Sequence, residues 1–195
     1  KTMREDYGNP SAKHIKGVDA ENHVMEAADI VAKTLKAKKN EIVFTSGGTE
    51  SNNMALIGAA LANKKAGKHI IISAIEHPAV YKPADFLAEL GYEISVLPVN
   101  HEGQADVEEL KKLLRDDTIL VSVMYVNNEM GACQDIGKIS HIIKEKNPEI
   151  LFHVDAIQAY TKYRIAPKQL GVDLLSASSH KFHGPKGVGF LYIAS

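Results

Sequence analysis

Cysteine and tryptophan are the residues that this sequence of 195 residues has least of: it contains one cysteine and no tryptophan. The single Cys133 excludes an intrachain disulfide framework and is typical of a reducing compartment, here expected to be the cytoplasm. No apolar run reaches the length of a membrane-spanning helix, and the first residues contain no signal-peptide core. The formal net charge is only −1. No basic face is therefore expected, and neither nucleic acid nor a membrane is predicted as a partner.

The two ends of the sequence resemble the interior of a longer protein. The sequence begins with KTMREDYGNP, without an initiator methionine, and it ends with FLYIAS at the close of an apparent strand. The length suits one sizeable α/β domain and is short for two. We therefore expect residues 1–195 to form one domain of a larger protein.

Short apolar runs rich in β-branched residues alternate with longer helical patterns. Several runs are apolar throughout, which is typical of parallel strands covered by helices on both faces. Apolar residues at helical spacing predict helices over 49–67, 106–117 and 135–148, and an earlier helix spans about 19–38. The alternation predicts an α/β fold with a mostly parallel sheet of about seven strands. The predicted strands are 41–46, 69–74, 92–99, 119–126, 151–156, 173–178 and 188–193.

Polar residues recur where the predicted strands end, and ligands of open α/β sheets bind at that edge. In FTSGGTES, a strand leads through two glycines into a helix that begins near Gly48 and Thr49, an arrangement that suits either an anion or a simple helix cap. His77 in EHPAV could stack on a flat ring, move a proton, or cap the next helix. No P-loop or dinucleotide-binding motif is present.

Three further segments continue this pattern. Asn127 and Asn128 follow an apolar strand, where they could hold a ligand hydroxyl or form a turn. Asp155 ends another apolar strand, so it needs a cation, a hydrogen-bond donor or a helix to cap. Gln158 lies three residues further on and could reach the same ligand.

Lys181 is the least expected residue of the segment SASSHKFHGPKGVGFLYI. A lysine held at a buried strand end can lose its proton and attack a carbonyl group, whereas a surface lysine would only bind phosphate or solvent. His180 and His183 have no thiolate or carboxylate at ligand spacing, so no metal is predicted. Together the five segments provide a phosphate cradle, a carboxylate for a ring nitrogen, a stacking histidine and an amine, as pyridoxal 5′-phosphate requires.

These segments closely resemble the NifS/IscS group of cysteine desulfurases, which are fold type I pyridoxal-phosphate enzymes of the class V aminotransferase family. The resemblance extends from about YGNPSA to the last residue. The ending HGPKG favours this group over the SufS-like proteins and the selenocysteine lyases. The segments that carry the resemblance are FTSGGTESNN, EHPAV, DDTILVSVMYVNNEMG, HVDAIQ and SSHKFHGPKGVGFLYI.

The resemblance implies three catalytic residues. Lys181 would form the covalent link to the cofactor and then carry protons, His77 would stack on the pyridine ring and assist acid–base steps, and Asp155 would pair with the ring nitrogen. The other implied cofactor contacts are Gln158 at the phenolic oxygen, Asn128 at cofactor or substrate, and Gly48, Thr49, Ser178 and His180 at the phosphate.

The resemblance implies conversion of L-cysteine to L-alanine, with the sulfur passing to an enzyme cysteine and then to an acceptor such as an iron–sulfur scaffold protein. It also implies a homodimer. The family carries its reactive cysteine far downstream of the lysine, a position that Cys133 does not occupy, and its small C-terminal domain is absent here. We therefore expect this chain alone to be inactive. Another class V aminotransferase or lyase, or a non-catalytic domain of the same fold, remains an alternative.

Overall fold

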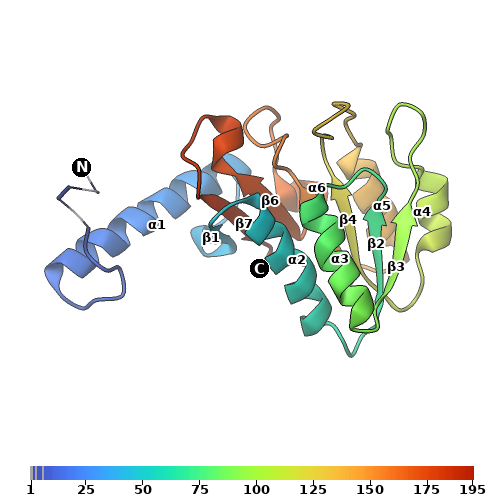
Figure 1. Ribbon diagram of the computed structural model, residues 1–195, viewed down its shortest axis with the longest axis horizontal. Coiled ribbons are helices and arrows are strands. Elements are labelled where there is room, and N and C mark those ends of the chain that lie inside the picture. Colours follow the sequence, from blue (N-terminus) through green and yellow to red (C-terminus); the bar gives the residue numbers. More distant parts are fainter. Residues whose placement is uncertain (1, 3, 6) are drawn as a thin grey trace.

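The structure is a computed structural model that describes residues 2, 4–5 and 7–195. Residues 1, 3 and 6, which the predicted domain includes, lie outside the described part. One seven-stranded sheet organises the chain (Figure 1). All seven predicted strands are present, with ends that differ by at most two residues. The strands are β1 (Ile42–Thr45), β2 (His69–Ser73), β3 (Glu93–Leu97), β4 (Thr118–Met124), β5 (Leu151–Asp155), β6 (Leu174–Ser178) and β7 (Gly189–Ile193).

The sheet is mostly parallel, as the sequence predicts. The strand order is β1-β7-β6-β5-β4-β2-β3, and only β7 runs against its neighbours. From β6 to β3 every pair is parallel, so these strands end at one edge of the sheet. The strand-end residues singled out in the sequence are thereby brought to a common edge.

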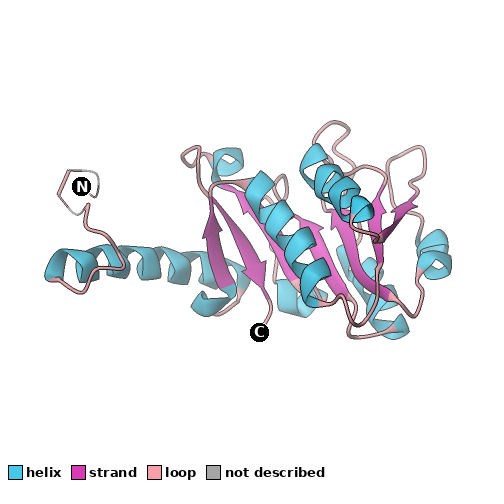
Figure 2. Ribbon diagram, turned by 60° about the horizontal axis from the view of Figure 1, so that its bottom comes forward, coloured by secondary structure: helices cyan, strands magenta, loops and turns pink. Residues whose placement is uncertain are grey.

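Helices cover both faces of the sheet (Figure 2). The predicted helices are confirmed, although α1 begins four residues earlier than expected and α2 and α4 end several residues earlier. Helix α3 was predicted only as the helix that His77 could cap, without bounds, and the short helix α6 was not predicted. The helices are α1 (Ile15–Leu35), α2 (Gly48–Ala62), α3 (Pro78–Glu89), α4 (Val107–Leu113), α5 (Ile136–Lys146) and α6 (Pro167–Leu170), and the 3₁₀ turns are η1 (Lys39–Glu41) and η2 (Ser179–Phe182).

Each face of the sheet has its own hydrophobic core. The core under α2 and α3 contains Leu56 and Leu87, both fully buried. The core on the other face joins α1, α4 and α5 and contains Leu35 and Ile143. Burial of these side chains stabilises the layered arrangement by roughly 1.5–3 kcal/mol for each large apolar residue. The amino-terminal part of α1 projects away from this body (Figure 1).

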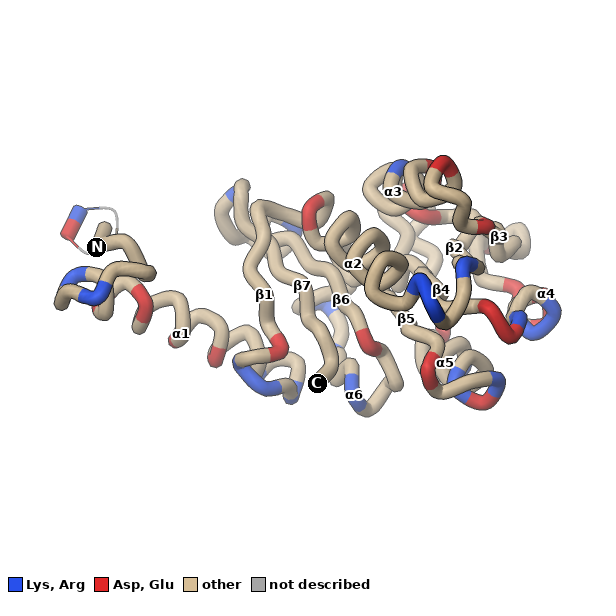
Figure 3. Tube along the Cα trace, turned by 90° about the horizontal axis from the view of Figure 1, so that it is seen from below, with Lys and Arg blue, Asp and Glu red and all other residues tan. Residues whose placement is uncertain are grey.

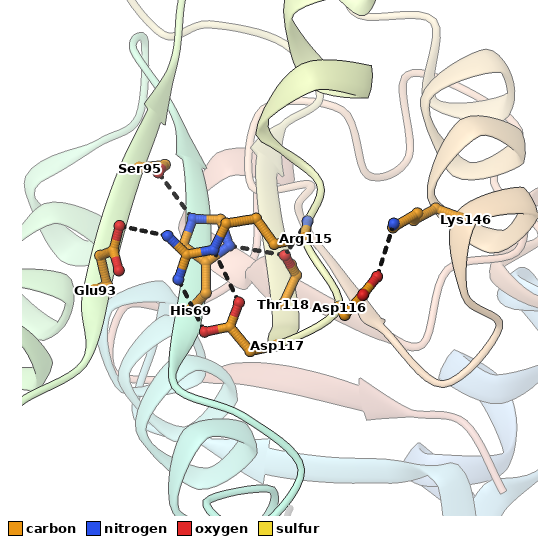
Figure 4. Close-up of polar contacts among 8 residues, drawn as sticks. All are labelled: His69, Glu93, Ser95, Arg115, Asp116, Asp117, Thr118 and Lys146. Atoms are coloured by element: carbon orange, nitrogen blue, oxygen red, sulfur yellow. Dashed lines mark hydrogen bonds and ion pairs between the residues drawn. The ribbon is translucent and has the colours of Figure 1, made fainter.

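A polar network joins three strands at the edge where the parallel strands begin (Figure 4). The His69 ring bonds through Nδ1 to Thr118 Oγ1 at 2.7 Å and through Nε2 to Ser95 Oγ at 2.8 Å. Beside it, Arg115 donates two bonds of 2.8 Å to the Asp117 carboxylate. The network fixes β2, β3 and β4 at the end opposite the predicted site.

Basic and acidic residues alternate along the described part of the chain. Figure 3 shows basic and acidic segments interspersed along α1, α4 and α5. This distribution agrees with the small net charge, from which no basic face was expected. Within the described part of the chain, every helix is too short or too polar to cross a membrane.

Candidate active site

A cavity of about 190 Å³ lies at the carboxyl ends of the parallel strands. All nine predicted site residues line it, although they come from five separate segments of the chain. The structure therefore brings together what the sequence analysis singled out piece by piece. The lining residues are Gly48, Thr49, His77, Ala79, Met124, Asn128, Asp155, Ile157, Gln158, Ser178, His180 and Lys181.

One side of the cavity is formed by the amino-terminal end of α2. Gly47 has φ +156°, which glycine adopts without strain, and a side chain at Gly48 would collide with Ile157 Cδ1. The backbone therefore approaches the cavity closely, with the positive end of the helix dipole beside it. Ser178 Oγ lies 2.9 Å from His180 Nδ1 on the facing segment. These donors suit a phosphate group.

Asp155 provides a buried carboxylate at the end of β5. Only 1% of the residue is exposed. Its Oδ2 accepts a bond of 2.8 Å from Asn52 Nδ2, and its Oδ1 accepts one of 3.0 Å from the Ile157 amide. Burial raises the pKa of this carboxyl, while these two hydrogen bonds and the nearby His77 lower it. Neutral amides hold the carboxylate in place, and a protonated ring nitrogen would supply the missing positive charge.

His77 lies just past β2 and performs two tasks. It is the N-cap of α3, where its Nδ1 accepts a bond of 3.1 Å from the Ala79 amide. In the neutral ring the proton is therefore on Nε2, which remains available for a ligand. The capping role and the cavity-lining position, which the sequence analysis treated as alternatives, occur together.

Lys181 lines the cavity but is not the buried amine that the sequence analysis expected. The residue is exposed, because the chain leaves β6 at Ser178 and passes through the turn η2 at the rim of the sheet. Its ammonium group has no hydrogen bond or ion pair with any residue of the described chain. An unpaired amine at the rim can reach a ligand in the cavity without breaking an existing interaction.

The two asparagines after β4 have different surroundings. Asn127 is buried, donates to the Ile75 carbonyl at 2.9 Å and accepts from the amides of Glu129 and Met130. Asn127 therefore shapes the turn, which was one of the two alternatives that the sequence left open. Asn128 is exposed and lines the cavity. The preference for Asn128 as the ligand contact is consistent with this placement.

Cys133 lies outside this cavity. It is exposed and lines a different hollow with Gln104 and Asp135. Among the described residues, no three His, Cys, Asp or Glu side chains are close enough to hold a metal ion. Of the two histidines beside Lys181, His180 bonds through Nδ1 to Ser178 Oγ.

Two buried polar residues near the cavity were missed by the sequence analysis. Asn52 supports Asp155 from the first turns of α2, and Glu76 lies directly before His77. Asn52 belongs to a helical segment whose pattern alone does not show which face is buried. Glu76 precedes a proline-initiated helix, where an acidic residue is usually an exposed cap. The signal that could have found Glu76 is its place just past the end of the predicted strand 69–74.

The donor set fits pyridoxal 5′-phosphate. Backbone amides and hydroxyl groups lie at one end of the cavity, a buried carboxylate without a cationic bond partner lies at its floor, and an unpaired lysine amine stands at its rim. A side chain at Gly48 would fill part of the phosphate end. These are the kinds of group that the phosphate, ring nitrogen and aldehyde of the cofactor require.

Comparison with known proteins gives the family. The model of the aminotransferase class V family matches residues 1–195. The chain belongs to the class V aminotransferase family. Cysteine desulfurase IscS of Dictyoglomus turgidum is 52% identical over 98% of this class V chain, and the mitochondrial cysteine desulfurase of Candida maltosa is 46% identical over 96% of it. The chain spans 48% and 38% of these two proteins, about half or less of their length.

Solved structures of similar proteins have the same fold as this class V chain. A NifS-like protein superimposes with a TM-score of 0.95 at 44% identity, covering 98% of this chain and 53% of its own. The structure titled SspA in complex with cysteine superimposes with a TM-score of 0.93 at 38% identity. The match covers 99% of this chain and 55% of that one. The class V aminotransferases and cysteine desulfurases that this chain resembles depend on pyridoxal 5′-phosphate. The predicted resemblance, fold class and cofactor are confirmed.

Proposed function

We propose that residues 1–195 are the cofactor-binding large domain of a pyridoxal-phosphate-dependent cysteine desulfurase. The reaction converts L-cysteine to L-alanine and transfers the sulfur to an enzyme cysteine as a persulfide. The observation that carries this proposal is the convergence of nine residues from five separate segments on one cavity whose groups fit the cofactor. The identity of about 50% to cysteine desulfurases supports the substrate.

The chain's own residues have distinct tasks in this proposal. When bound, pyridoxal phosphate supplies an electron sink for the bonds at the substrate α-carbon. The Asp155 carboxylate keeps a ring nitrogen protonated, and His77 covers the ring with its Nε2 proton available for transfer. Lys181 holds the cofactor through Nζ and afterwards carries protons at that atom. Gln158 and Asn128, which also line the cavity, would contact the polar groups of the cofactor or substrate.

The phosphate end of the site is assigned to the start of α2 and to the segment after β6. Gly48 and Thr49 offer amide and hydroxyl donors at the helix terminus, and Ser178 and His180 face them. The helix dipole and these donors bind an anion without a metal or a P-loop.

The proposal includes partners and location. The enzyme acts in the cytoplasm as a homodimer and passes sulfur to an acceptor such as an iron–sulfur scaffold protein. The persulfide thiol is not Cys133, because this residue lies in a separate hollow and not beside Lys181. The 195-residue chain alone is therefore expected not to turn over L-cysteine.

An optical experiment tests cofactor binding. Addition of pyridoxal 5′-phosphate should produce a visible absorption band that borohydride bleaches, and mass spectrometry should then locate the cofactor on Lys181. In Lys181→Ala the band of the covalently held cofactor should be lost, whereas Lys186→Ala, in the following turn, should keep it. Absence of the band in the wild-type protein, or an equal loss in both variants, would contradict the proposal.

A second experiment distinguishes the desulfurase from other class V enzymes. The full enzyme should release L-alanine from L-cysteine and hold a cyanide-releasable sulfur on one of its cysteines. Release of a keto acid without persulfide would instead indicate an aminotransferase. Cofactor binding without any amino-acid turnover would indicate a non-catalytic domain.

A further inference from the structure

Glu76 is a buried carboxyl group that the proposed reaction does not use. It lies in the turn between β2 and α3, directly before His77, and only 5% of the residue is exposed. A buried ionised carboxylate is costly unless a cation or several donors surround it. The arrangement of bonds around this side chain therefore reports its charge state.

Both hydrogen bonds of Glu76 go to one oxygen. Ser73 Oγ and the Met124 amide each donate to Oε1 at 2.6 Å. Its other oxygen, Oε2, is buried and has no partner among the described residues. An ionised carboxylate would leave part of its charge on a buried oxygen that no donor contacts. In the neutral acid Oε1 is the carbonyl oxygen and only the Oε2 hydroxyl lacks a partner, which costs less.

The charged groups around Glu76 also favour the neutral form. Burial is the largest cause that raises the pKa of Glu76, and repulsion by Asp155 on β5 adds to it; the hydrogen bonds from Ser73 and Met124 lower it, and the pKa is about 8. On α3, Tyr81 has its own pKa raised by burial and by Glu76. From β2 and β4, Ser73 and the Met124 amide face Glu76 as neutral donors, and His77 follows in the same turn. The side chain has no ion pair with any cation of the described chain.

We propose that Glu76 is a neutral positioning residue: its protonated carboxyl ties the turn that carries His77 to the end of β4, and its lack of charge leaves Asp155 to supply the negative charge beneath the cavity. The backbone link makes the first part direct, because Glu76 and His77 are consecutive. The bond to the Met124 amide fixes that turn against a strand whose end lines the cavity. A second buried anion near Asp155 would instead compete for the same positive partner.

The charge state is tested by the pH dependence of stability, without cofactor or substrate. A carboxyl that stays protonated in the folded protein but ionises when unfolded destabilises the fold as pH rises from about 4.5 to 8. Glu76→Gln removes this effect. The unfolding constant of Glu76→Gln, divided by that of the wild type, should therefore fall about 400-fold between pH 5 and pH 8. The control Glu89→Gln, exposed at the end of the same α3, should give a ratio independent of pH. A ratio for Glu76→Gln that stays constant or rises would overturn the proposal.

Infrared spectroscopy checks the same point directly. The wild-type protein at pH 6 should show a protonated-carboxyl C=O band that disappears in Glu76→Gln and persists in Glu89→Gln. Retention of every such band in Glu76→Gln would show that Glu76 is ionised and would overturn the proposal.

The positioning role rests on the proposed function and has its own readout. Glu76→Gln keeps a neutral side chain with a carbonyl oxygen, so the affinity for pyridoxal 5′-phosphate and the circular dichroism of the bound cofactor should stay within about twofold of wild type. Glu76→Ala should weaken binding about tenfold and reduce the dichroism for each bound molecule. Equal behaviour of the two variants would overturn the positioning role. Failure of the wild-type protein to bind the cofactor would instead contradict the proposed function, and the stability and infrared results would still decide the charge state.

Discussion

His153 lies in the middle of the sheet and is completely buried. Its Nδ1 bonds to Ser122 Oγ on β4 at 2.8 Å, and its Nε2 bonds to Ser176 Oγ on β6 at 3.0 Å. Burial lowers the pKa of the ring to about 3. The histidine is therefore neutral in the folded protein, with each serine hydroxyl free to rotate into the role that the ring tautomer requires.

The buried ring predicts loss of stability in acid. Below pH 6.5 the unfolded chain binds a proton at His153 and the folded chain does not, so stability falls as pH falls from about 6.5 to 3. Between pH 7 and pH 4.5 this residue should cost about 3 kcal/mol of unfolding free energy. Urea unfolding across this pH range measures the decrease in unfolding free energy. In His153→Gln this decrease should be smaller than in the wild type by the contribution of His153. His141→Gln, exposed on α5, should follow the wild-type curve. If His153→Gln lost as much unfolding free energy in acid as the wild type, the result would contradict the neutral state of buried His153.

At the scale of single residues, the sequence predicted the polar side chains that follow strands and missed those that support them. Asp155 and His77 were found because strand ends meet at one edge of a parallel sheet. Asn52 and Glu76 were missed, because their importance depends on contacts with residues 103 and 48 positions away. The burial of Lys181 was predicted wrongly, since the turn η2 at the rim is not visible in a strand pattern.

At the scale of elements, the close approach of α2 to the cavity depends on Gly48. A methyl group there would collide with Ile157 Cδ1, and Ile157 lines the cavity. Gly48→Ala should therefore push Ile157 into the ligand space and weaken cofactor binding about tenfold, or ~1.4 kcal/mol. Titration calorimetry with pyridoxal 5′-phosphate measures this change.

Two variants control for the helix itself. Gly58→Ala lies on the same helix with nothing within 4 Å of the added carbon, so it should bind the cofactor normally and gain up to about 1 kcal/mol of stability. Adding Ile157→Val to Gly48→Ala removes the colliding Cδ1 atom and should restore part of the affinity. Unchanged binding in Gly48→Ala alone would show that α2 can retreat without affecting the site.

The existence of the strands and long helices could be predicted, whereas the direction of β7 could not. Seven apolar runs at regular spacing indicate strands, but direction depends on how the chain returns from its turn. Here the segment after His183 reverses within a few residues, too short for a helical crossover, so β7 pairs antiparallel with β6. The short α6 was missed because four residues do not establish a periodicity.

At the scale of the whole molecule, α1 presents apolar side chains to solvent. Ile15 is 80% exposed and Ile30 is 58% exposed on a helix that projects from the body (Figure 1). Such residues on a projecting helix suit contact with a second copy, in line with the proposed homodimer. Sedimentation equilibrium should give a dimer that Ile15→Lys with Ile30→Lys shifts toward monomer. Val96→Lys, an exposed apolar residue on β3, should leave the dimer intact. A monomeric wild-type protein, or a dimer insensitive to the double change, would contradict this role of α1.

The distribution of the cavity residues along the chain has a consequence for folding kinetics. The lining extends in sequence from Gly48 to Lys181, and its floor exists only after β4, β5 and β6 have paired in parallel. Parallel pairing of distant segments is slow and is completed late in folding. A ligand that needs the whole cavity therefore arrives after the rate-limiting step. Such a ligand should lower the unfolding rate and leave the folding rate unchanged.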